Sequence, residues 1–580
     1  MIEIINKKIE LFISSIESID KDSVRIILNK SSTSISDDLN KGHITSNVCM
    51  VAASILKLNP RELSEKLKNT LDELNIFKNI QIAGPGFINI TLYKKEFASV
   101  LHNIIEERDS FGESNIGDGK KVQIEFVSAN PTGPLHVGHG RGAAYGDAIG
   151  RILKATGSTV EKEYYINDAG RQIDILTASV ILRAVQKKLS NFFPQNAYKG
   201  NYIDSISEEF TSNNKIEYDN VESIIKDLSS DPEEEIDNII IKLKNLDDLI
   251  WNSVKSFSLD SIIESIKNDL EDFSVSFDSW FNESSLGTLN DDSSEISKSI
   301  TKLKKDGKAY EKDGAIWLNT ENSGDDKHRV LIRDDGRATY FASDVAYHKN
   351  KMDRGYDDLI NVWGADHHGY IKRIEASIDA LGSKKEKLTV KLVQFANLFK
   401  NGESIKMSTR SGEFFTLREL FEDIGPDAAR FYYLSKQADQ HLDFDINIAK
   451  SDSKENIFYY IQYAHARIFS LEQKYVEMYP DLGTSIEAIE KDIYDKCDPL
   501  IHEISKYPNI VNKSARMLQP HIIIFYLKDL SQLFHSYYND NHVLSESQEN
   551  MQSIIFCLSA VRQVISNGLS ILGISPMQKM

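Results

Sequence analysis

The spacing of apolar residues divides the chain into three stretches with different periodicities. In the first stretch apolar residues recur at helical intervals, as at Ile9, Phe12, Ile13 and Ile16. Two short strand-like runs follow, at 80–82 and 87–92, and a glycine-containing turn at 83–86 joins them. Residues 1–110 are therefore predicted to form a small α/β domain.

The middle stretch, about 111–450, alternates strand-like with helix-like segments, which is the pattern of a parallel sheet with crossover helices. Its clearest strand candidates are 121–128, 159–166, 358–364 and 389–396. Between about 187 and 320 the alternation gives way to long polar helices with acidic patches, and a charge run of this kind is most often a solvated face. We predict an insertion into the sheet domain over this range.

Strand signals almost vanish from residue 451 to residue 580, and helical periodicity replaces them. Apolar or aromatic residues of this kind are Ile457, Tyr460, Ile461, Ala464 and Ile468. The last stretch is predicted to be an all-α domain. The whole chain is thus expected to be an α/β protein of several domains.

Composition agrees with a soluble globular protein, since 41% of the residues are hydrophobic and 27% are charged. No apolar run approaches the roughly 20 residues of a membrane helix, and residues 1–8 lack the layout of a signal peptide. The three cysteines form no C-x-x-C pair, which argues against zinc and against a disulfide framework. A cytoplasmic location without membrane attachment is expected.

The formal net charge of −19 argues against non-specific coating of nucleic acid, which requires a broad basic surface. A local basic track for one folded RNA remains compatible with this charge. Any role with RNA must therefore be inferred from motifs.

The most informative motif is Ser128–Arg141, which lies between a predicted strand and a predicted helix that ends near Gly157. Backbone N–H groups at such a helix start bind anions. Glycines weaken the helix that follows, so close approach by another group is expected at its first turns. His136 and His139 stand at this opening, and we predict a phosphate-handling site.

Other interpretations of this motif are weaker. His136 and His139 have the spacing of a metal pair, but no third ligand lies nearby in the sequence. The run 138–143 fits the G-x-G-x-x-A dinucleotide fingerprint, but the preceding loop is too long for that tight turn. A G-x-x-x-x-G-K-[ST] phosphate loop is absent from the sequence.

A second motif, Lys406-Met407-Ser408-Thr409-Arg410, follows a strand and precedes a helix expected to start near Thr416. Cations on a loop of small residues suit the binding of polyphosphate during a reaction. Alone, such a loop is more often an ordinary solvated turn.

Together the two motifs resemble the H-I-G-H and K-M-S-K-S motifs of class I aminoacyl-tRNA synthetases. The longer run Ala129–His139 is similar to the form found in arginyl-tRNA synthetases, as are Tyr165–Gln172 and Trp363–Tyr370. Tyr459–Arg467 resembles the anticodon-binding domain of that family. The resemblance covers essentially the whole chain.

This resemblance implies a Rossmann-like catalytic domain, an N-terminal domain that contacts the tRNA elbow, and a helical anticodon-binding domain. The implied enzyme activates L-arginine with ATP to arginyl-adenylate and transfers it to the 3′ end of tRNA(Arg). It implies Mg²⁺ as Mg-ATP, no zinc, and a monomer. It also implies that activation requires tRNA.

By resemblance, His136 and His139 stabilise the α-phosphate, and Gly138 leaves space for adenine. Lys406, with Met407 and Ser408, would hold ATP and steady the leaving pyrophosphate. Thr409 replaces the second lysine of the family motif, and Arg410 is the candidate substitute cation, although guanidinium and ammonium differ in reach and hydration.

Arginine recognition requires a carboxylate fork and favours a flat aromatic neighbour. Tyr340 and Asp344 are four residues apart and share a face if a helix begins there, and the resemblance assigns both to the substrate side chain. The alternative is a helix acid beside a core tyrosine. The remaining candidates for the arginine site are Glu125, Ser128, Asn130, His139 and His367. Glu125 would hold the α-amino group or orient Asn130.

The candidate tRNA contacts are Tyr463, Arg467, Tyr537 and Asn539, because unpaired bases stack on aromatic rings. Core packing is the alternative for each tyrosine. Two other functions are alternatives to arginyl transfer. One is another H-x-G-H nucleotidyl transferase, and the other is a non-catalytic tRNA-binding relative.

Overall fold

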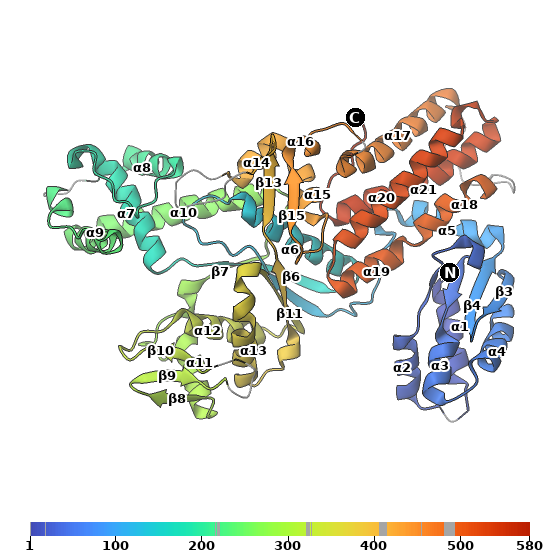
Figure 1. The fold of residues 1–580 in the computed structure, drawn as a ribbon, viewed down its shortest axis with the longest axis horizontal. Helices are drawn as coiled ribbons and strands as arrows, with labels where there is room; N and C mark the ends of the chain where they lie inside the picture. Colours follow the sequence, from blue (N-terminus) through green and yellow to red (C-terminus); the bar gives the residue numbers. More distant parts are fainter. Residues whose placement is uncertain are drawn as a thin grey trace.

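The structure is a computed structural model that describes residues 2–17, 19–214, 216, 221–320, 325, 327–404, 415–453, 455–480 and 494–580. Figure 1 shows a central parallel sheet flanked by a helical lobe on one side and by the C-terminal helices on the other. The N-terminal domain packs beneath the C-terminal helices. The chain is therefore an α/β protein with an all-helical C-terminal part, as predicted.

The central sheet has the strand order β12-β11-β5-β6-β7, and all of its strands are parallel. Its strands are β5 (Lys121–Glu125), β6 (Thr159–Ile166), β7 (Ser279–Asn282), β11 (Asp358–Gly364) and β12 (Leu388–Val393). This is a doubly wound arrangement in which the order reverses between β5 and β11, and ligands bind outside the carboxyl ends of strands at such a point.

The predicted strands at 159–166 and 358–364 match β6 and β11. β5 ends at Glu125 rather than at residue 128, because Val127 and Ser128 adopt positive φ angles of 66° and 43° that leave the extended region. The chain therefore turns sharply at the carboxyl end of the first strand, beside the switch point.

Helix α6 (Val137–Ala155) follows this turn and packs against the sheet. A Cβ atom on Gly146 would lie 2.3 Å from the ring of Phe126, and one on Gly140 would lie 2.6 Å from the ring of Tyr433. A close approach to this helix was predicted, and at these two glycines the groups that approach are aromatic rings of the protein itself.

The helical lobe, green to teal in Figure 1, lies between β6 and β7 in the sequence. Its helices are α7 (Arg171–Val185), α8 (Asn201–Asn213), α9 (Pro232–Leu246) and α10 (Asp248–Asp272). β7 belongs to the central sheet but falls inside 187–320, the range predicted to be one insertion. β7 therefore divides residues 187–320 into two parts.

The second part of that range starts a smaller lobe with its own apolar core around Leu303, Leu331 and Val345. It comprises α11 (Glu295–Lys305), β8 (Ala309–Lys312), β9 (Ala315–Leu318), β10 (Arg329–Ile332), α12 (Tyr340–Asp353) and α13 (Ile371–Ala380). Helix α12 connects this lobe to β11 of the central sheet.

A connecting region follows the central sheet and joins it to the C-terminal helices. It comprises β13 (Ala396–Lys400), β14 (Glu403–Ser404), α14 (Leu417–Ile424), α15 (Pro426–Leu434), β15 (Leu442–Asp445) and α16 (Ile446–Ala449). β13 pairs with β14 and β15, so these strands form a second sheet.

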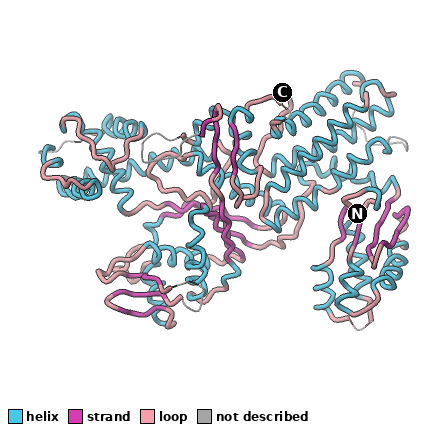
Figure 2. The backbone as a smooth tube through the Cα atoms, in the orientation of Figure 1, coloured by secondary structure: helices cyan, strands magenta, loops and turns pink. Residues whose placement is uncertain are grey.

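Beyond residue 455 the described part of the chain is helical, and Figure 2 shows helices and loops in this region. The helices are α17 (Ile457–Met478), α18 (Tyr494–Ser505), α19 (Tyr507–Met517), α20 (His521–Asp540) and α21 (Gln548–Ile571). By length and composition, α21 passes the test for a membrane span, which differs from the sequence expectation. The most apolar window of α21 is 67% buried inside the protein, as expected for a core helix.

The N-terminal domain carries a four-stranded antiparallel sheet in the order β1-β2-β4-β3. Its elements are α1 (Ile2–Ser14), α2 (Lys21–Lys30), β1 (Thr33–Ile35), β2 (Ile44–Ser46), α3 (Val48–Leu56), α4 (Pro60–Asp72), β3 (Phe77–Ala83) and β4 (Phe87–Leu92). β3 and β4 form the predicted hairpin. Helix α5 (Lys94–Glu107) then packs against α18 and α21.

Candidate active site

The two histidines of the first motif cap helix α6. His136 is the N-cap residue, and its Nδ1 accepts a hydrogen bond from the Gly138 N–H at 3.0 Å. The His136 N–H in turn donates to His139 Nδ1 at 3.2 Å, and the two rings stack with centroids 3.7 Å apart. Because both Nδ1 atoms accept, each neutral ring carries its proton on Nε2.

Burial lowers the pKa of His136, and burial together with His136 lowers the pKa of His139 to about 3. Both rings are therefore neutral near pH 7, and they act as hydrogen-bond donors rather than as cations. Two Nε2–H donors at a helix N-terminus suit the oxygens of a phosphate.

The segment that follows the second motif is fixed beside the histidines. The Val137 N–H donates to Phe415 O at 3.3 Å, and the Leu417 N–H donates to Leu135 O at 2.8 Å. Thr416 caps α14, which confirms the helix predicted there. Lys406, Met407, Ser408 and Arg410 lie outside the described residues, but the described chain downstream of them pairs directly with the histidine turn.

A group of three carboxylates lies at the carboxyl edge of the central sheet. Glu125 ends β5, Glu283 follows β7, and Asp344 lies on the first turns of α12. Asp344 Oδ2 accepts a hydrogen bond from the Tyr370 hydroxyl. Both Glu125 and Glu283 act on the charge of Asp344, so the three form one electrostatic group.

The electrostatics of this group differ from those of a stable internal ion pair. Burial raises the pKa of Asp344 to about 7, and Glu125 and Glu283 add to the rise against the opposing effects of Tyr370 and Lys351. Burial also raises the pKa of Glu283, which accepts hydrogen bonds from Tyr165 and Ser343. The carboxylates thus repel one another, and a cationic ligand would relieve this repulsion.

Several residues predicted for the arginine site lie around these carboxylates. Ser128 donates to Glu125 Oε1 at 3.2 Å, whereas the Asn130 side chain donates to Gln172 at 2.8 Å. Glu125 therefore orients Ser128 rather than Asn130. Helix α12 begins at Tyr340, so Tyr340 and Asp344 are one helical turn apart, as the sequence predicted.

Tyr340 and His367, two further candidates for the arginine site, are both exposed. Tyr340 is 69% exposed, and a Cβ on Gly170 would lie 3.9 Å from its hydroxyl. His367 contacts Asp366 and Trp363, so the structure does not bring it to the three carboxylates.

Glu283, Tyr165 and Tyr370 also belong to this site, although none of them was predicted as a site residue. Glu283 is in a segment that was interpreted as a solvated acidic insertion. Tyr370 ends the motif Trp363–Tyr370, in which only His367 was predicted as a site residue. Only the strand order β5-β6-β7 and the packing of α12 bring these residues together.

The expected tRNA contacts form a cluster of rings on the C-terminal helices. The Arg467 guanidinium lies 5.2 Å from the ring centroid of Tyr463 and 3.9 Å from that of Tyr538. Tyr537 does not contribute to this surface, because its ring is 8% exposed and its hydroxyl lies 3.6 Å from Cys497 Sγ. Its neighbour Tyr538 takes that place, and Asn539 is exposed.

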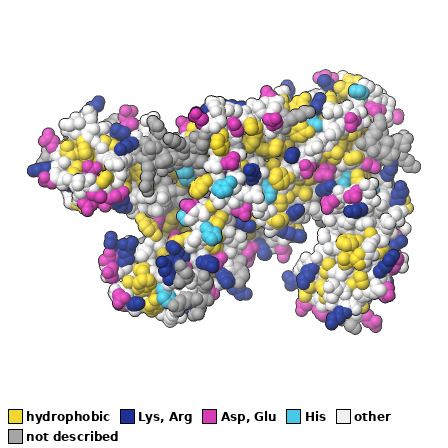
Figure 3. Space-filling view, in the orientation of Figure 1, with side chains coloured by type: hydrophobic (Ala, Val, Ile, Leu, Met, Phe, Trp, Pro, Cys, Tyr) yellow, Lys and Arg dark blue, Asp and Glu magenta, His cyan; other side chains and the backbone are white. Residues whose placement is uncertain are grey.

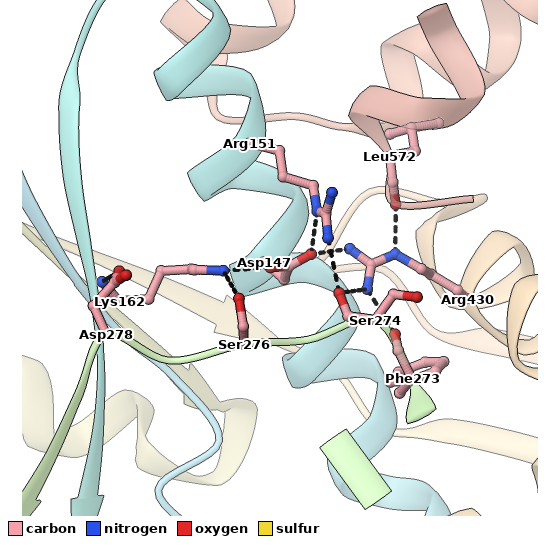
Figure 4. Close-up of polar contacts among 9 residues, drawn as sticks. All are labelled: Asp147, Arg151, Lys162, Phe273, Ser274, Ser276, Asp278, Arg430 and Leu572. Carbon is pink, nitrogen blue, oxygen red and sulfur yellow. Dashed lines mark hydrogen bonds and ion pairs between the residues drawn. The ribbon is translucent and has the colours of Figure 1, made fainter. Parts of the chain in front are cut away.

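A second buried charged cluster lies further along α6. Asp147 is paired with Lys162 at 2.8 Å, with Arg151 at 2.7 Å, and with Arg430. Figure 4 shows these three cations converging on the one carboxylate. Arg430 also donates to the carbonyls of Phe273 and Leu572, so the cluster joins the helical lobe, α6 and the end of α21.

The described residues contain no group of three or more His, Cys, Asp or Glu placed to hold a metal ion. The Nδ1 atoms of His136 and His139 are engaged by backbone N–H groups, which does not favour the metal-pair interpretation. Figure 3 shows acidic and basic side chains interspersed over the visible face rather than one broad basic surface.

Comparisons with known proteins agree with this geometry. The arginyl tRNA synthetase N terminal domain family matches residues 3–92, the catalytic domain family of class I tRNA synthetases (R) matches residues 100–479, and the DALR anticodon binding domain family matches residues 461–580.

Individual relatives are similar over nearly the whole chain. An arginine–tRNA ligase of Acinetobacter baumannii is 42% identical over 575 residues, covering 95% of this chain and 96% of the relative. One from Desulfosudis oleivorans is 43% identical and covers 93% of both chains. The arginyl-tRNA synthetase structure of Thermus thermophilus has a similar fold, with a TM-score of 0.71 at 18% identity over 97% of this chain and 99% of that one.

Proposed function

Because the chain belongs to the arginyl-tRNA synthetase family and therefore joins arginine to tRNA(Arg) with cleavage of ATP, we propose that its active site has two halves. A histidine half at the start of α6 binds ATP, and a carboxylate half around Asp344 binds arginine. The observation that carries this proposal is the group of mutually repelling carboxylates Glu125, Glu283 and Asp344 at the sheet switch point. Neither a general nucleotidyl transferase nor a non-catalytic relative needs such a group.

In the carboxylate half, Asp344 and Glu283 receive the guanidinium, whose planar N–H groups match two carboxylates. Tyr340 flanks the side chain. Ser128, Asn130 and Glu125 bind the α-amino and carboxylate end, which brings the arginine carboxylate toward His139. Lysine is rejected because a point ammonium leaves part of the fork unpaired, and unpaired buried polar groups are costly.

In the histidine half, the arginine carboxylate oxygen attacks the α-phosphorus, and the bond from that phosphorus to pyrophosphate breaks. Negative charge develops on the α-phosphate oxygens, and the Nε2–H groups of His136 and His139 donate to them. Gly138 allows adenine to lie against the backbone. Lys406 and Arg410, with Met407 and Ser408, hold the leaving pyrophosphate, and Mg²⁺ shares its charge.

In the second step, the terminal ribose hydroxyl of the tRNA attacks the acyl carbon of arginyl-adenylate, and AMP leaves. Tyr463, Arg467, Tyr538 and Asn539 contact the anticodon loop, where unpaired bases stack on rings. The N-terminal domain contacts the tRNA elbow. The enzyme acts as a monomer in the cytoplasm.

The test of this function is amino-acid-dependent ATP–pyrophosphate exchange, measured for the twenty amino acids with and without tRNA. We expect exchange with arginine alone and only when tRNA is present. Exchange driven by lysine would contradict the carboxylate fork, and strong exchange without tRNA would contradict the tRNA requirement.

The same assay tests the division into halves. Asp344→Ala should lower kcat/KM for arginine by about 10²–10³ while the KM for ATP changes little, because the buried charge that pairs with the guanidinium is lost. Asp353→Ala is the matched control, since Asp353 ends the same helix and its side chain is 59% exposed. Equal losses for arginine and ATP in Asp344→Ala would contradict its place in the arginine half.

A further inference from the structure

Beneath the carboxylates lies a fully buried lysine that the proposed reaction does not use. Lys351 is 0% exposed and lies on α12. Its Nζ pairs with Glu125 on β5, donates to Asn361 Oδ1 on β11 at 3.0 Å, and lies 4.4 Å from the ring centroid of Tyr347. Each of the three ammonium protons thus has a partner, two of them on the strands of the switch point.

The hydrogen bonds run outward from Lys351 in a fixed direction. Asn361 Nδ2 donates to His348 Nε2 at 2.9 Å, and His348 Nδ1 lies 2.8 Å from the backbone O of Asp344. A carbonyl only accepts, so the His348 proton is on Nδ1 and its Nε2 accepts from Asn361. On the other side, Glu125 accepts from both Lys351 and Ser128.

One continuous chain of polar contacts therefore connects the two ends of the arginine site. It begins at Ser128, where the backbone turns at positive φ, and ends at the backbone of Asp344. Glu125 and Asn361 face each other in the register of β5 and β11, so Lys351 fastens α12 across the switch point.

The charges around Glu125 come from every element that packs against it. They are Asp344, Tyr347 and Lys351 on α12, and Glu163 and Tyr165 on β6, while Glu283 after β7 acts on Asp344 and Tyr165. Lys351 is the cation of this set, while Arg354 is engaged with Glu163. Removing the Lys351 charge would leave Glu125 as an unpaired buried carboxylate among other acids.

We propose that Lys351 is a positioning residue that sets the charge and spacing of the arginine site without touching the substrate. It holds Glu125 in place beside Ser128, and through Asn361 and His348 it fixes the turn of α12 that carries Asp344. The two cationic ends of arginine then meet carboxylates at a fixed separation. This inference rests on the proposed function of the carboxylate half.

A purely structural role explains the arrangement less well. Replacing a buried ion pair by apolar groups of similar size is often neutral or stabilising, so stability alone does not call for a lysine here. The Lys351–Glu125 ion pair instead lies at the place in the sheet where the charged substrate arginine is proposed to bind.

Lys351→Met tests the proposal, because methionine fills similar space beside Tyr347 without the charge. We expect kcat/KM for arginine in the exchange assay to fall by about 30–100-fold near pH 7, with little change in the KM for ATP. The loss should shrink as pH rises, because Lys351 lowers the pKa of Asp344, and without Lys351 this carboxyl must lose a proton at higher pH before arginine binds. An unchanged KM for arginine, or a loss independent of pH, would overturn the proposal.

Lys162→Met is the matched control. Lys162 is a nearly buried lysine on the neighbouring strand β6 and pairs with Asp147 at 2.8 Å instead of with the arginine site. The Lys162→Met variant should be less stable but should retain the arginine KM and the pH profile of the native enzyme. If Lys162→Met changed the arginine KM and the pH profile as Lys351→Met does, loss of any buried lysine of the sheet would have this effect, and the specific role of Lys351 would be contradicted.

A double variant keeps the test decisive if Lys351→Met does not fold. Lys351→Met with Glu125→Gln leaves no unpaired charge, and it is compared with Glu125→Gln alone. If Lys351 acts through the charge of Glu125, the two should differ by less than about twofold in the arginine KM. Additive losses would overturn the proposal. Absence of arginine exchange in the native enzyme would instead sink the proposed function itself.

Discussion

Two aspartates of the catalytic domain, Asp147 and Asp344, have opposite electrostatic surroundings. Asp147 faces three cations, and although burial raises its pKa, Arg430, Arg151 and Lys162 outweigh burial and lower it to about 2. Asp344 faces two carboxylates and one lysine, and its pKa rises to about 7. Burial raises the pKa of both carboxyls, so the difference in direction comes from the neighbouring charges.

The difference separates a structural cluster from a binding site. The Asp147 cluster is complete, because its cations and the carbonyls of Phe273 and Leu572 join three parts of the chain without a ligand (Figure 4). The Asp344 group has one cation, Lys351, for its three carboxylates. A buried group with excess like charge is destabilising until a ligand of opposite charge binds, and this marks it as functional.

The largest effect should come from breaking the complete cluster. Asp147→Asn leaves Arg430 and Lys162 as buried unpaired cations, and we expect it to lower the free energy of unfolding by about 3–5 kcal/mol. Urea denaturation measures this loss, and Asp353→Asn on the surface is the control. A loss below about 1 kcal/mol would mean that the cluster is not structural.

The same cluster has a defined pH dependence. The folded pKa of Asp147, about 2, is below its unfolded value near 4. Its contribution to stability is therefore present above about pH 4 and is lost as the pH falls toward about 2.

A smaller effect should come from removing one of the three carboxylates of the Asp344 group. Glu283→Gln should raise the KM for arginine by about 10–100-fold, since a charge-assisted hydrogen bond to the guanidinium is lost. The unfolding free energy should stay the same or increase, because repulsion with Asp344 is relieved. The exchange assay and urea denaturation measure the two quantities. Lower stability without a change in arginine KM would make Glu283 a structural acid like Asp147.

The smallest effect concerns protonation of Asp344 in the native enzyme. Arginine binds the ionised carboxylate, so its KM should rise about tenfold between about pH 8 and about pH 6, as the proton returns to a group with a pKa of about 7. Titration calorimetry in buffers of different ionisation enthalpy should detect proton release on arginine binding near pH 7. An Asp344→Asn variant that keeps the same pH dependence would assign the titration to another group.

Local patterns sufficed for those parts of the molecule that are encoded by contiguous residues. β6 and β11 follow from their apolar runs, and the capping by His136 and His139 depends only on residues three apart. β7 was missed because it has four residues at the edge of the sheet, after a long helical lobe. Without β7, nothing in the sequence places Glu283 next to Asp344.

Contacts between distant segments explain the other differences. The sequence does not distinguish Tyr537 from Tyr538, and only the packing of α20 buries the first and leaves the second beside Arg467. The chain of polar contacts through Lys351 likewise depends on the pairing of β5 with β11, whose residues are more than two hundred positions apart.

The docking of α5 against the C-terminal helices has a consequence for synthesis of the chain. Asn567 on α21 donates to the carbonyls of Arg108 and Phe111, and the separation from Arg108 is 459 residues. At about 5–20 residues per second, α5 leaves the ribosome roughly 20–90 s before that partner is made. During that interval α5 lacks α18 and α21, the helices against which it packs in the folded protein, so this face of α5 stays uncovered while translation continues.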